Sequence, residues 1–215
     1  MSWLAFDTAT DRASVALGTG GAAIERHADG ARGHARQLLP MIDELLREAG
    51  KSLADLDGVI VADGPGSFTG LRVGASVAKA LHDAVGLSLF TAPSLLGCAL
   101  AGAELGKAVL VTSNALRGDV YAAVYGFGDG AVQILHAPSV VRQADATSLW
   151  EGAVELEVTP ADARRLIQLV GWTDGLDLIK NVAAWAPEYG RPAEAQAQWE
   201  RTHGRALAHP PSLAG

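Results

Sequence analysis

The stretch DGPGSFTGLRVG, residues 63–74, contains four glycines and one proline within twelve residues. It follows the apolar run VIVA at 59–62 and opens a helix-like segment that ends near Gly86. This order of strand, glycine-rich loop and helix predicts an α/β fold. Backbone amides at the positive end of a helix can bind an anion, but the same residues also make a plain tight turn. The function of the chain depends on whether this loop is an anion-binding site or a plain tight turn.

The two familiar phosphate-binding motifs do not fit the loop. A P-loop needs a lysine directly after its last glycine, and here Leu71 follows Gly70. The dinucleotide motif G-x-G-x-x-G is one residue shorter than the spacing of Gly64, Gly66 and Gly70. Ser67 can cap the following helix with its hydroxyl. Gly64, Gly66 and Ser67 therefore remain candidates for nucleotide binding only through the helix end.

A second candidate for nucleotide chemistry lies at the end of the first predicted strand, in FDTATD at 6–11. A carboxylate at Asp7, beside Thr8 and Thr10, could hold a metal-bound water next to ATP or ADP. Ordinary turn chemistry also explains these residues, because such side chains often bond nearby backbone groups. The sequence allows a nucleotide here and requires no cofactor.

Other catalytic patterns are absent from the sequence. No two of the six histidines are spaced i and i+4, as a helical metal site would need, and His34 has Leu38 at that position. No G-x-S-x-G elbow is present. The single cysteine, Cys98, sits in an apolar run that is typical of core packing. We predict no catalytic residue and no metal site.

The two early helices carry more apolar surface than one lobe is expected to cover. In segment 33–50 the apolar stripe is wider than the roughly 100° that one-sided burial requires. In the helix after the loop, small residues recur every fourth position, which lets another backbone approach closely. Packing inside the chain's own lobe is the alternative. We predict a partner interface at His34, Leu38, Leu39, Ile42, Leu45, Leu46, Gly70, Leu71, Gly74, Val77, Ala78 and Leu81.

Patterning along the chain indicates two related lobes. Of the 215 residues 49% are apolar, which is enough for a substantial core. Three short strands are expected within 3–26 and three more within 108–137. We predict a first lobe at 1–103 and a smaller second lobe at 104–215, each a mixed sheet with an antiparallel three-stranded start and flanking helices. Helices are expected at 161–170 and 176–185, and a C-terminal helix starting near Pro192 is expected to pack back on the first lobe.

The net charge of −7 argues against broad unaided contact with nucleic acid, because such contact needs clustered lysine and arginine. A partner would have to supply the positive surface. The N-terminus opens directly into a strand-like run, so neither a signal peptide nor a membrane span is expected. A cytoplasmic protein is the default expectation.

Three segments together resemble one protein family: LAFDTATDRASVAL at 4–17, HARQLLPMIDELL at 34–46 and DGPGSFTGLRVG at 63–74. In order and spacing they are similar to the TsaB family, also called YeaZ, of tRNA threonylcarbamoyladenosine biosynthesis proteins. The resemblance implies a two-lobed, ribonuclease H-like fold of the actin and sugar-kinase type. It also implies a non-catalytic paralogue of the subunit TsaD, since the TsaD metal motif H-x-x-x-H reads His34 to Leu38 here.

The same resemblance implies a scaffold that activates a threonylcarbamoyltransferase complex. The two early helices would form a bundle with TsaD, and the ATPase TsaE would join them. The chain would bind tRNA mainly through the complex. The complex moves a threonylcarbamoyl group onto the adenosine beside the anticodon of tRNAs that read codons beginning with adenine. Two alternatives stay open: a homodimer through the same surface, and a small ATP-dependent kinase or ATPase that uses Asp7 and the glycine loop.

The second half of the chain departs from the family pattern. SNALRGDVY at 113–121 lacks the acid of the usual D-A-R-x-G-E-V-Y but keeps Arg117, Gly118 and Tyr121. The usual P-x-Y-L-R near the C-terminus is not recognised, and AEAQAQWERTHG at 193–204 is assigned to that region. These departures weaken a nucleotide-binding role for the second lobe and leave the predicted interface untouched.

Overall fold

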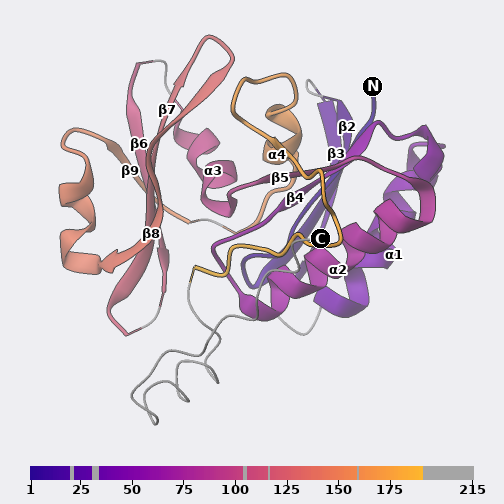
Figure 1. Ribbon diagram of the computed structural model, residues 1–215, viewed down its shortest axis with the longest axis horizontal. Coiled ribbons are helices and arrows are strands. Elements are labelled where there is room, and N and C mark those ends of the chain that lie inside the picture. Colours follow the sequence, from indigo (N-terminus) through magenta and orange to yellow (C-terminus); the bar gives the residue numbers. More distant parts are fainter. Residues whose placement is uncertain (20–21, 31–33, 104–105, 116, 159, 191–215) are drawn as a thin grey trace.

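The computed structural model describes residues 1–19, 22–30, 34–103, 106–115, 117–158 and 160–190, and it contains two β-sheets (Figure 1). The larger sheet has six strands in the order β10-β5-β4-β1-β2-β3. β1 pairs antiparallel with β2 and parallel with β4, so an initial meander is followed by a crossover. The strands are β1 (Trp3–Asp7), β2 (Arg12–Thr19), β3 (Ala22–Asp29), β4 (Gly58–Ala62), β5 (Leu89–Ala92) and β10 (Asp177–Leu178).

The smaller sheet repeats the start of the larger one. Its order is β8-β7-β6-β9, and β9 pairs parallel with β6 as β4 pairs with β1. At the turn between β7 and β8, Asp129 and Gly130 both have positive φ, which matches the twist of a tight hairpin. The predicted pair of strand triplets is confirmed. The strands are β6 (Ala108–Asn114), β7 (Asp119–Gly128), β8 (Ala131–Arg142) and β9 (Val154–Glu157).

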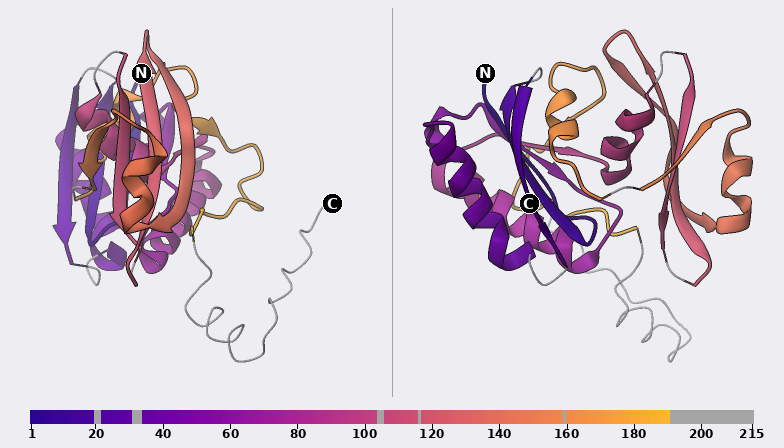
Figure 2. Two further views of the ribbon diagram at one scale, coloured as in Figure 1. Left: turned by 90° about the vertical axis from the view of Figure 1, so that its left-hand side faces the viewer. Right: turned by 180° about the vertical axis from the view of Figure 1, so that it is seen from behind.

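Helices form layers around and between the two sheets (Figures 1 and 2). On the outer face of the larger sheet lie α1 (His34–Glu48) and α2 (Phe68–Val85), whereas α3 (Ser94–Ala99) and α4 (Arg164–Gln168) lie between the sheets. Three short 3₁₀ helices complete the set within the described residues: η1 (Leu53–Asp55), η2 (Leu100–Gly102) and η3 (Gln143–Leu149). The last of them packs on β7 and β8 of the smaller sheet.

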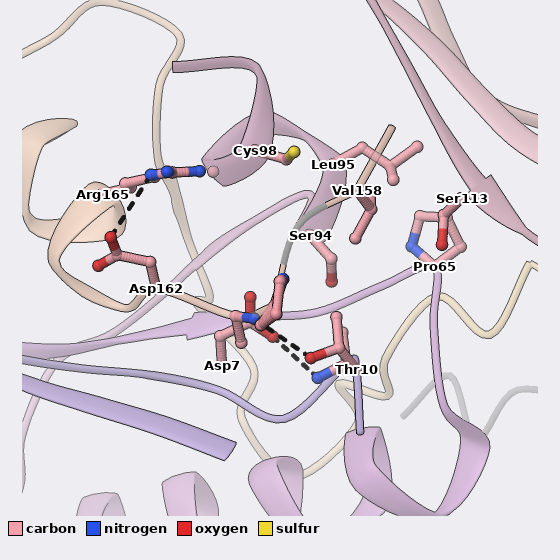
Figure 3. Close-up of a pocket in the computed structure, with 14 residues that line it drawn as sticks. Asp7, Thr10, Pro65, Ser94, Leu95, Cys98, Ser113, Val158, Asp162 and Arg165 are labelled. Carbon is pink, nitrogen blue, oxygen red and sulfur yellow. Dashed lines mark hydrogen bonds and ion pairs between the residues drawn. The ribbon is translucent and has the colours of Figure 1, made fainter. Parts of the chain in front are cut away.

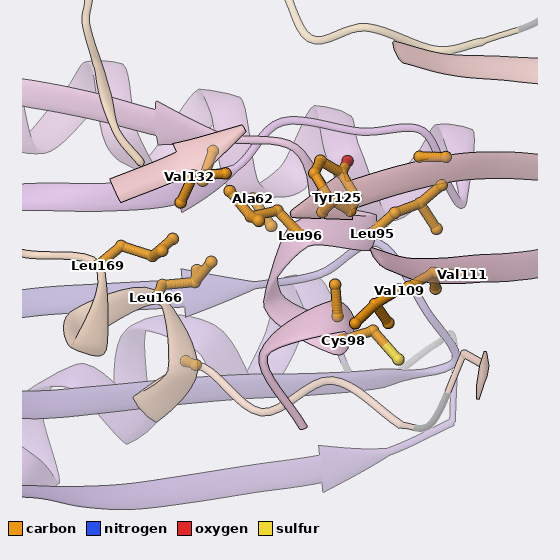
Figure 4. Close-up of a cluster of buried hydrophobic side chains, with 14 of the residues drawn as sticks. Ala62, Leu95, Leu96, Cys98, Val109, Val111, Tyr125, Val132, Leu166 and Leu169 are labelled. Carbon is orange, nitrogen blue, oxygen red and sulfur yellow. The ribbon is translucent and has the colours of Figure 1, made fainter. Parts of the chain in front are cut away.

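The central strands are buried on both faces. In β1, Leu4 and Phe6 join the apolar cluster under α1 and α2, while Ala5 joins the cluster between the sheets. Figure 4 shows this second cluster, in which Leu95 of α3 and Leu166 of α4 lie among side chains of both sheets. Apolar runs without alternation, such as VIVA, are what strands buried on both faces require. One continuous core therefore joins the two lobes.

The chain returns to the first lobe after β9. α4 packs on β1 and β2, and β10 pairs antiparallel with β5. The prediction that 104–215 forms the second lobe is therefore wrong beyond β9, because α4 packs on the larger sheet and β10 is one of its strands. The helix predicted at 176–185 is also wrong, since this segment contains β10 and turns, and the helix expected at 161–170 covers only α4. The predicted C-terminal helix lies outside the described residues.

Candidate functional site

Asp7 and its neighbours form a self-contained turn at the end of β1. The Asp7 carboxylate accepts a hydrogen bond from the Ala9 amide at 2.8 Å. The fully buried Thr8 hydroxyl donates to the carbonyl of Gly70 at 2.7 Å, and the Thr10 hydroxyl donates to the Arg12 carbonyl at 3.1 Å. Burial raises the pKa of Asp7 to about 6, although the Ala9 amide lowers it. The bonds of Asp7 and Thr10 are those of turn chemistry, whereas the Thr8 bond ties the turn to the start of α2.

Three amides of the glycine loop, those of Gly64, Ser67 and Gly70, are bonded to the protein itself. The Gly64 amide donates to the Ser94 hydroxyl at 2.9 Å, and the Ser67 amide donates to the Ala9 carbonyl at 2.7 Å. The Ser67 hydroxyl caps α2 by accepting from the Gly70 amide at 3.2 Å. A phosphate cradle needs such amides to point at the ligand. Here the amides of Gly64 and Ser67 hold the loop against α3 and the β1–β2 turn, respectively.

Two glycines of the loop are required by close packing. A Cβ on Gly66 would lie 2.5 Å from the carbonyl oxygen of Ala9, and one on Gly64 would overlap the carbonyl of Glu188. Gly64 also has a φ of +119°, which strongly favours glycine. The glycines therefore bring three chain segments together.

The space between Asp7 and the loop is almost filled (Figure 3). The segment that leads into α4 covers the turn, because the Ala161 amide donates to the Thr10 hydroxyl at 3.2 Å and the Ala163 amide to the Ser14 hydroxyl at 2.8 Å. The remaining cavity measures ≈ 20 Å³, room for about one water, whereas ligand pockets usually measure about 300–1,000 Å³.

An anion would also meet an unfavourable field in this cavity. Asp162 lines it together with Asp7, and its negative charge is a further cause of the raised pKa of Asp7. Arg165, the basic residue of the wall, lies 3.5 Å from the Asp162 carboxylate (Figure 3). The structure thus brings the predicted nucleotide-binding residues together, and the described cavity beside Asp7 is too small for a nucleotide. Those residues are Asp7, Thr8, Thr10, Gly64, Gly66 and Ser67.

Most of the predicted interface residues pack into the chain's own core, so that part of the prediction is wrong. On α1 the stripe meets the larger sheet, and on α2 a Cβ at Gly74 would lie 2.6 Å from the Thr8 hydroxyl. The small residues therefore let α2 approach its own sheet. The residues buried in this way are Leu38, Ile42, Leu45, Leu46, Gly70, Leu71, Gly74, Ala78 and Leu81. The side chain of His34 lies outside what the structure describes.

A narrower apolar surface remains on the outer side of the two helices. Leu39 of α1 is 54% exposed. On α2, the half-buried Val73 and Val77 and the exposed Ala80 and Ala84 follow one another at helical spacing along a single stripe. We call these four α2 residues the outer stripe. Of the predicted interface, Leu39 and Val77 are the members still available to a partner.

Sequence reasoning missed the segment 182–190, which we call the C-terminal strap. It crosses the glycine loop, where the Glu188 amide donates to the Asp63 carbonyl at 2.7 Å. Tyr189 packs on Phe68 at the start of α2, with ring centroids 4.6 Å apart. Pro187, Glu188 and Tyr189 match the letters of the first three positions of P-x-Y-L-R and precede the region 193–204.

The described part of the chain contains neither a metal-binding cluster nor a helix suited to crossing a membrane. No group of three or more His, Cys, Asp or Glu side chains there could hold a metal ion. None of the described helices is both long enough and apolar enough to cross a membrane.

Comparison with known proteins gives consistent matches. The family model of TsaD, tRNA N6-adenosine threonylcarbamoyltransferase, matches residues 28–167. The tRNA threonylcarbamoyladenosine biosynthesis protein TsaB of Escherichia coli is 35% identical over 154 residues, covering 71% of this chain and 59% of that protein. TsaB of Haemophilus influenzae is 37% identical over 123 residues, covering 56% of this chain and 52% of that protein. The chain thus spans between half and two thirds of these curated relatives.

A solved structure extends the match to the fold. YeaZ from Pseudomonas aeruginosa is 27% identical, has a TM-score of 0.69, and is matched over 79% of this chain and 90% of that chain. The predicted two-lobed α/β fold of the YeaZ proteins is confirmed. The chain belongs to the TsaD family, and within that family its relatives by sequence and by structure are the TsaB, or YeaZ, proteins.

Proposed function

We propose that the chain is a non-catalytic subunit that docks onto TsaD and thereby supports threonylcarbamoyl transfer to tRNA. Its relatives are named for threonylcarbamoyladenosine biosynthesis, and its family model is that of the transferase. Such a subunit contributes geometry to its partner and performs no bond chemistry itself.

The observation that carries the proposal is the contrast between the cleft and the helices. The cleft in which an actin-type enzyme would hold its nucleotide is reduced to ≈ 20 Å³. The outer stripe and Leu39 remain accessible on adjacent helices. Small side chains such as alanine let a second helix pack closely against the stripe. Two helices with an uncovered seam suit a bundle completed by two helices of another subunit.

A small ATP-dependent kinase or ATPase is the competing function. It would need the lobes to separate enough to admit a nucleotide beside Asp7. That movement would open part of the apolar core between the two sheets. The geometry therefore favours the docking subunit.

A charge placed in the outer stripe tests the proposal. Ala80→Glu puts a carboxylate in the seam, and burying it without a partner should weaken TsaD binding by roughly a hundredfold. Ala101→Glu, at an exposed alanine of η2, is the matched control and should bind as the wild type does. Affinities are measured by calorimetry with the cognate TsaD, and thermal unfolding checks each fold. Equal affinity of both variants would remove α2 from the interface.

The remaining partners follow from the same arrangement. With a net charge of −7, the chain would contact tRNA mainly through the complex, and TsaE would join the assembled pair. In the absence of TsaD, the same seam can pair with a second copy, since one apolar surface can complement itself around a two-fold axis. Sedimentation of wild type and Ala80→Glu over a range of concentrations checks this: the variant should stay monomeric where the wild type dimerises.

A further inference from the structure

A second and much larger cavity lies under the C-terminal strap. It measures ≈ 470 Å³ and is bounded by the glycine loop, by β5, by β10, by the strap and, from the smaller sheet, by β7 and β8. This volume falls within the range of small-molecule pockets, about 300–1,000 Å³. The cavity shares Pro65 with the filled cleft around Asp7 but opens on the other side of the loop.

The wall of this cavity is acidic. Asp63 follows β4, Asp177 belongs to β10 and Glu188 belongs to the strap. Among the described residues that line the cavity there is no lysine or arginine to pair with these carboxylates. Lys79 reaches the strap, but its ammonium donates to the Ala183 carbonyl at 3.2 Å. An uncompensated cluster of carboxylates in a partly buried cavity attracts a cation.

The carboxylates do not form a metal site. No three acidic or histidine side chains of the described chain come close enough together to bind one ion. They are spread over three segments of one wall, which suits an elongated cation with its charge in more than one place. Trp185 and Ile179 supply apolar surface in the same cavity, and hydrocarbon can pack there.

A buried group near Asp63 adds an unused hydrogen-bond donor. The Tyr125 hydroxyl is fully buried and has no hydrogen-bond partner among the described residues (Figure 4). Burial raises the pKa of this phenol, and the negative charge of Asp63 raises it further, although Tyr125 does not itself line the cavity. A buried polar group without a partner is rare in native proteins and is often explained by a missing ligand or water.

We propose that this cavity binds a small organic cation, an alkylammonium or guanidinium compound, held by the carboxylates of Asp63, Asp177 and Glu188. The hydrocarbon part of the ligand lies against Trp185 and Ile179. The carboxylates supply the electrostatic attraction, and the two apolar side chains supply a packing surface; the Lys79 ammonium already lies 5.8 Å from the centre of the Trp185 ring. The same chemistry is offered by a free diamine and by a lysine or arginine side chain of a polypeptide.

Calorimetric titration of the full-length protein tests this site. The probes are putrescine and agmatine as free cations, the amide of N-acetylarginine as a blocked side chain, and 1,4-butanediol as the neutral control. Saturable binding of a cationic probe with Kd below about 1 mM, and no binding of the diol, is the expected result. If only the blocked arginine binds, the site takes a polypeptide side chain rather than a free amine. No saturation below about 10 mM by any cation, or equal binding of the diol, overturns the proposal.

Matched variants locate the binding. Asp63→Asn and Glu188→Gln each keep the shape of the wall and should weaken binding at least about tenfold, because each removes one charge that faces the ligand. Glu151→Gln changes an exposed residue that does not line the cavity and should bind as the wild type does. Thermal unfolding with and without ligand confirms that each variant folds. Unchanged affinity in both Asp63→Asn and Glu188→Gln overturns the proposal.

The pH dependence provides an independent readout. Burial raises the pKa of Asp63 to about 7, a hydrogen bond from Thr91 opposes this, and the charges of Glu188 and Asp177 raise it further. A guanidinium stays charged throughout this range. Agmatine binding should therefore tighten as the pH rises from about 6 to about 8, and the effect should vanish in Asp63→Asn. Affinity that falls over this range contradicts the assignment.

Discussion

A matched pair of glycine substitutions tests whether α2 is held against its own sheet. Gly74 and Gly97 both lie inside helices, α2 and α3, and neither has a positive φ. An added Cβ at Gly74 would lie 2.6 Å from the Thr8 hydroxyl, whereas one at Gly97 would lie 3.5 Å from Leu166, an ordinary contact. The two alanine variants therefore differ in packing and hardly in backbone conformation.

The expected free energies follow from these contacts. Replacing a helical glycine by alanine gains about 0.5–1 kcal/mol at either position, through the lower entropy of the unfolded chain. At Gly74 the overpacked site costs about 1–3 kcal/mol. The Thr8 hydroxyl cannot move away freely, because it donates a buried hydrogen bond to the Gly70 carbonyl. Such a hydrogen bond is worth about 1 kcal/mol. Gly74→Ala should thus be less stable than Gly97→Ala by about 1–3 kcal/mol, whatever the exact helix propensity.

Urea unfolding followed by circular dichroism measures this difference, with the slope of the transition checked for each variant. Gly97→Ala should be as stable as the wild type or slightly more stable. If Gly74→Ala proved as stable as Gly97→Ala, α2 would not be in close contact with β1, and the small residues would again be available to a partner.

Three further predictions follow from the site. Asp63 has a pKa of about 7 in the folded chain, above its ordinary 3.8, so its contribution favours folding at low pH and is lost as the pH rises through about 7. Asp63→Asn should therefore gain stability relative to the wild type, on the order of 2 kcal/mol, between about pH 4 and pH 8 in urea unfolding. Tyr189→Ala removes the ring contact with Phe68 and should cost about 1–2 kcal/mol, while Tyr189→Phe should be neutral in the same assay. ATP should bind the isolated chain with a Kd weaker than about 1 mM by calorimetry, because the cleft beside Asp7 has no room for it, and tight binding would require the lobes to open.

Much of the fold could be predicted because short sequence patterns determine many of its elements. VIVA, the glycine loop and the helix ending at Gly86 appear as β4, the loop and α2, with Gly86 in the left-handed conformation as its C-cap. Asp129 and Gly130 likewise mark the hairpin between β7 and β8. In each case the signal lies within a few residues of the feature that it predicts.

The remaining elements depend on distant contacts and carry weak local signals. β10 has two residues and exists because Asp177 and Leu178 pair with β5. The strap is held by the Glu188 amide and by the ring of Tyr189, and both reach the glycine loop more than a hundred residues earlier in the chain. Periodicity within 176–190 could not reveal these contacts.

The candidate site shows a different limit of sequence reasoning. The width of the α1 stripe correctly marked residues such as Leu38 and Leu45 as apolar contacts, but it could not say which surface they meet. They meet the chain's own sheet, and the accessible seam is the outer stripe of α2 with Leu39. For the glycine loop, the sequence left two interpretations open, and the bonds of Gly64 and Ser67 support the structural one.

Reconstituted threonylcarbamoyl transfer to tRNA tests the central claim most directly. The assay contains the cognate TsaD and TsaE with no added chain, with the wild type, with Asp7→Asn or with Ala80→Glu. Transfer is expected with the wild type and with Asp7→Asn, whereas it should be lost with Ala80→Glu and without the chain. Full transfer in the absence of the chain, or loss with Asp7→Asn while Ala80→Glu still works, would contradict the account.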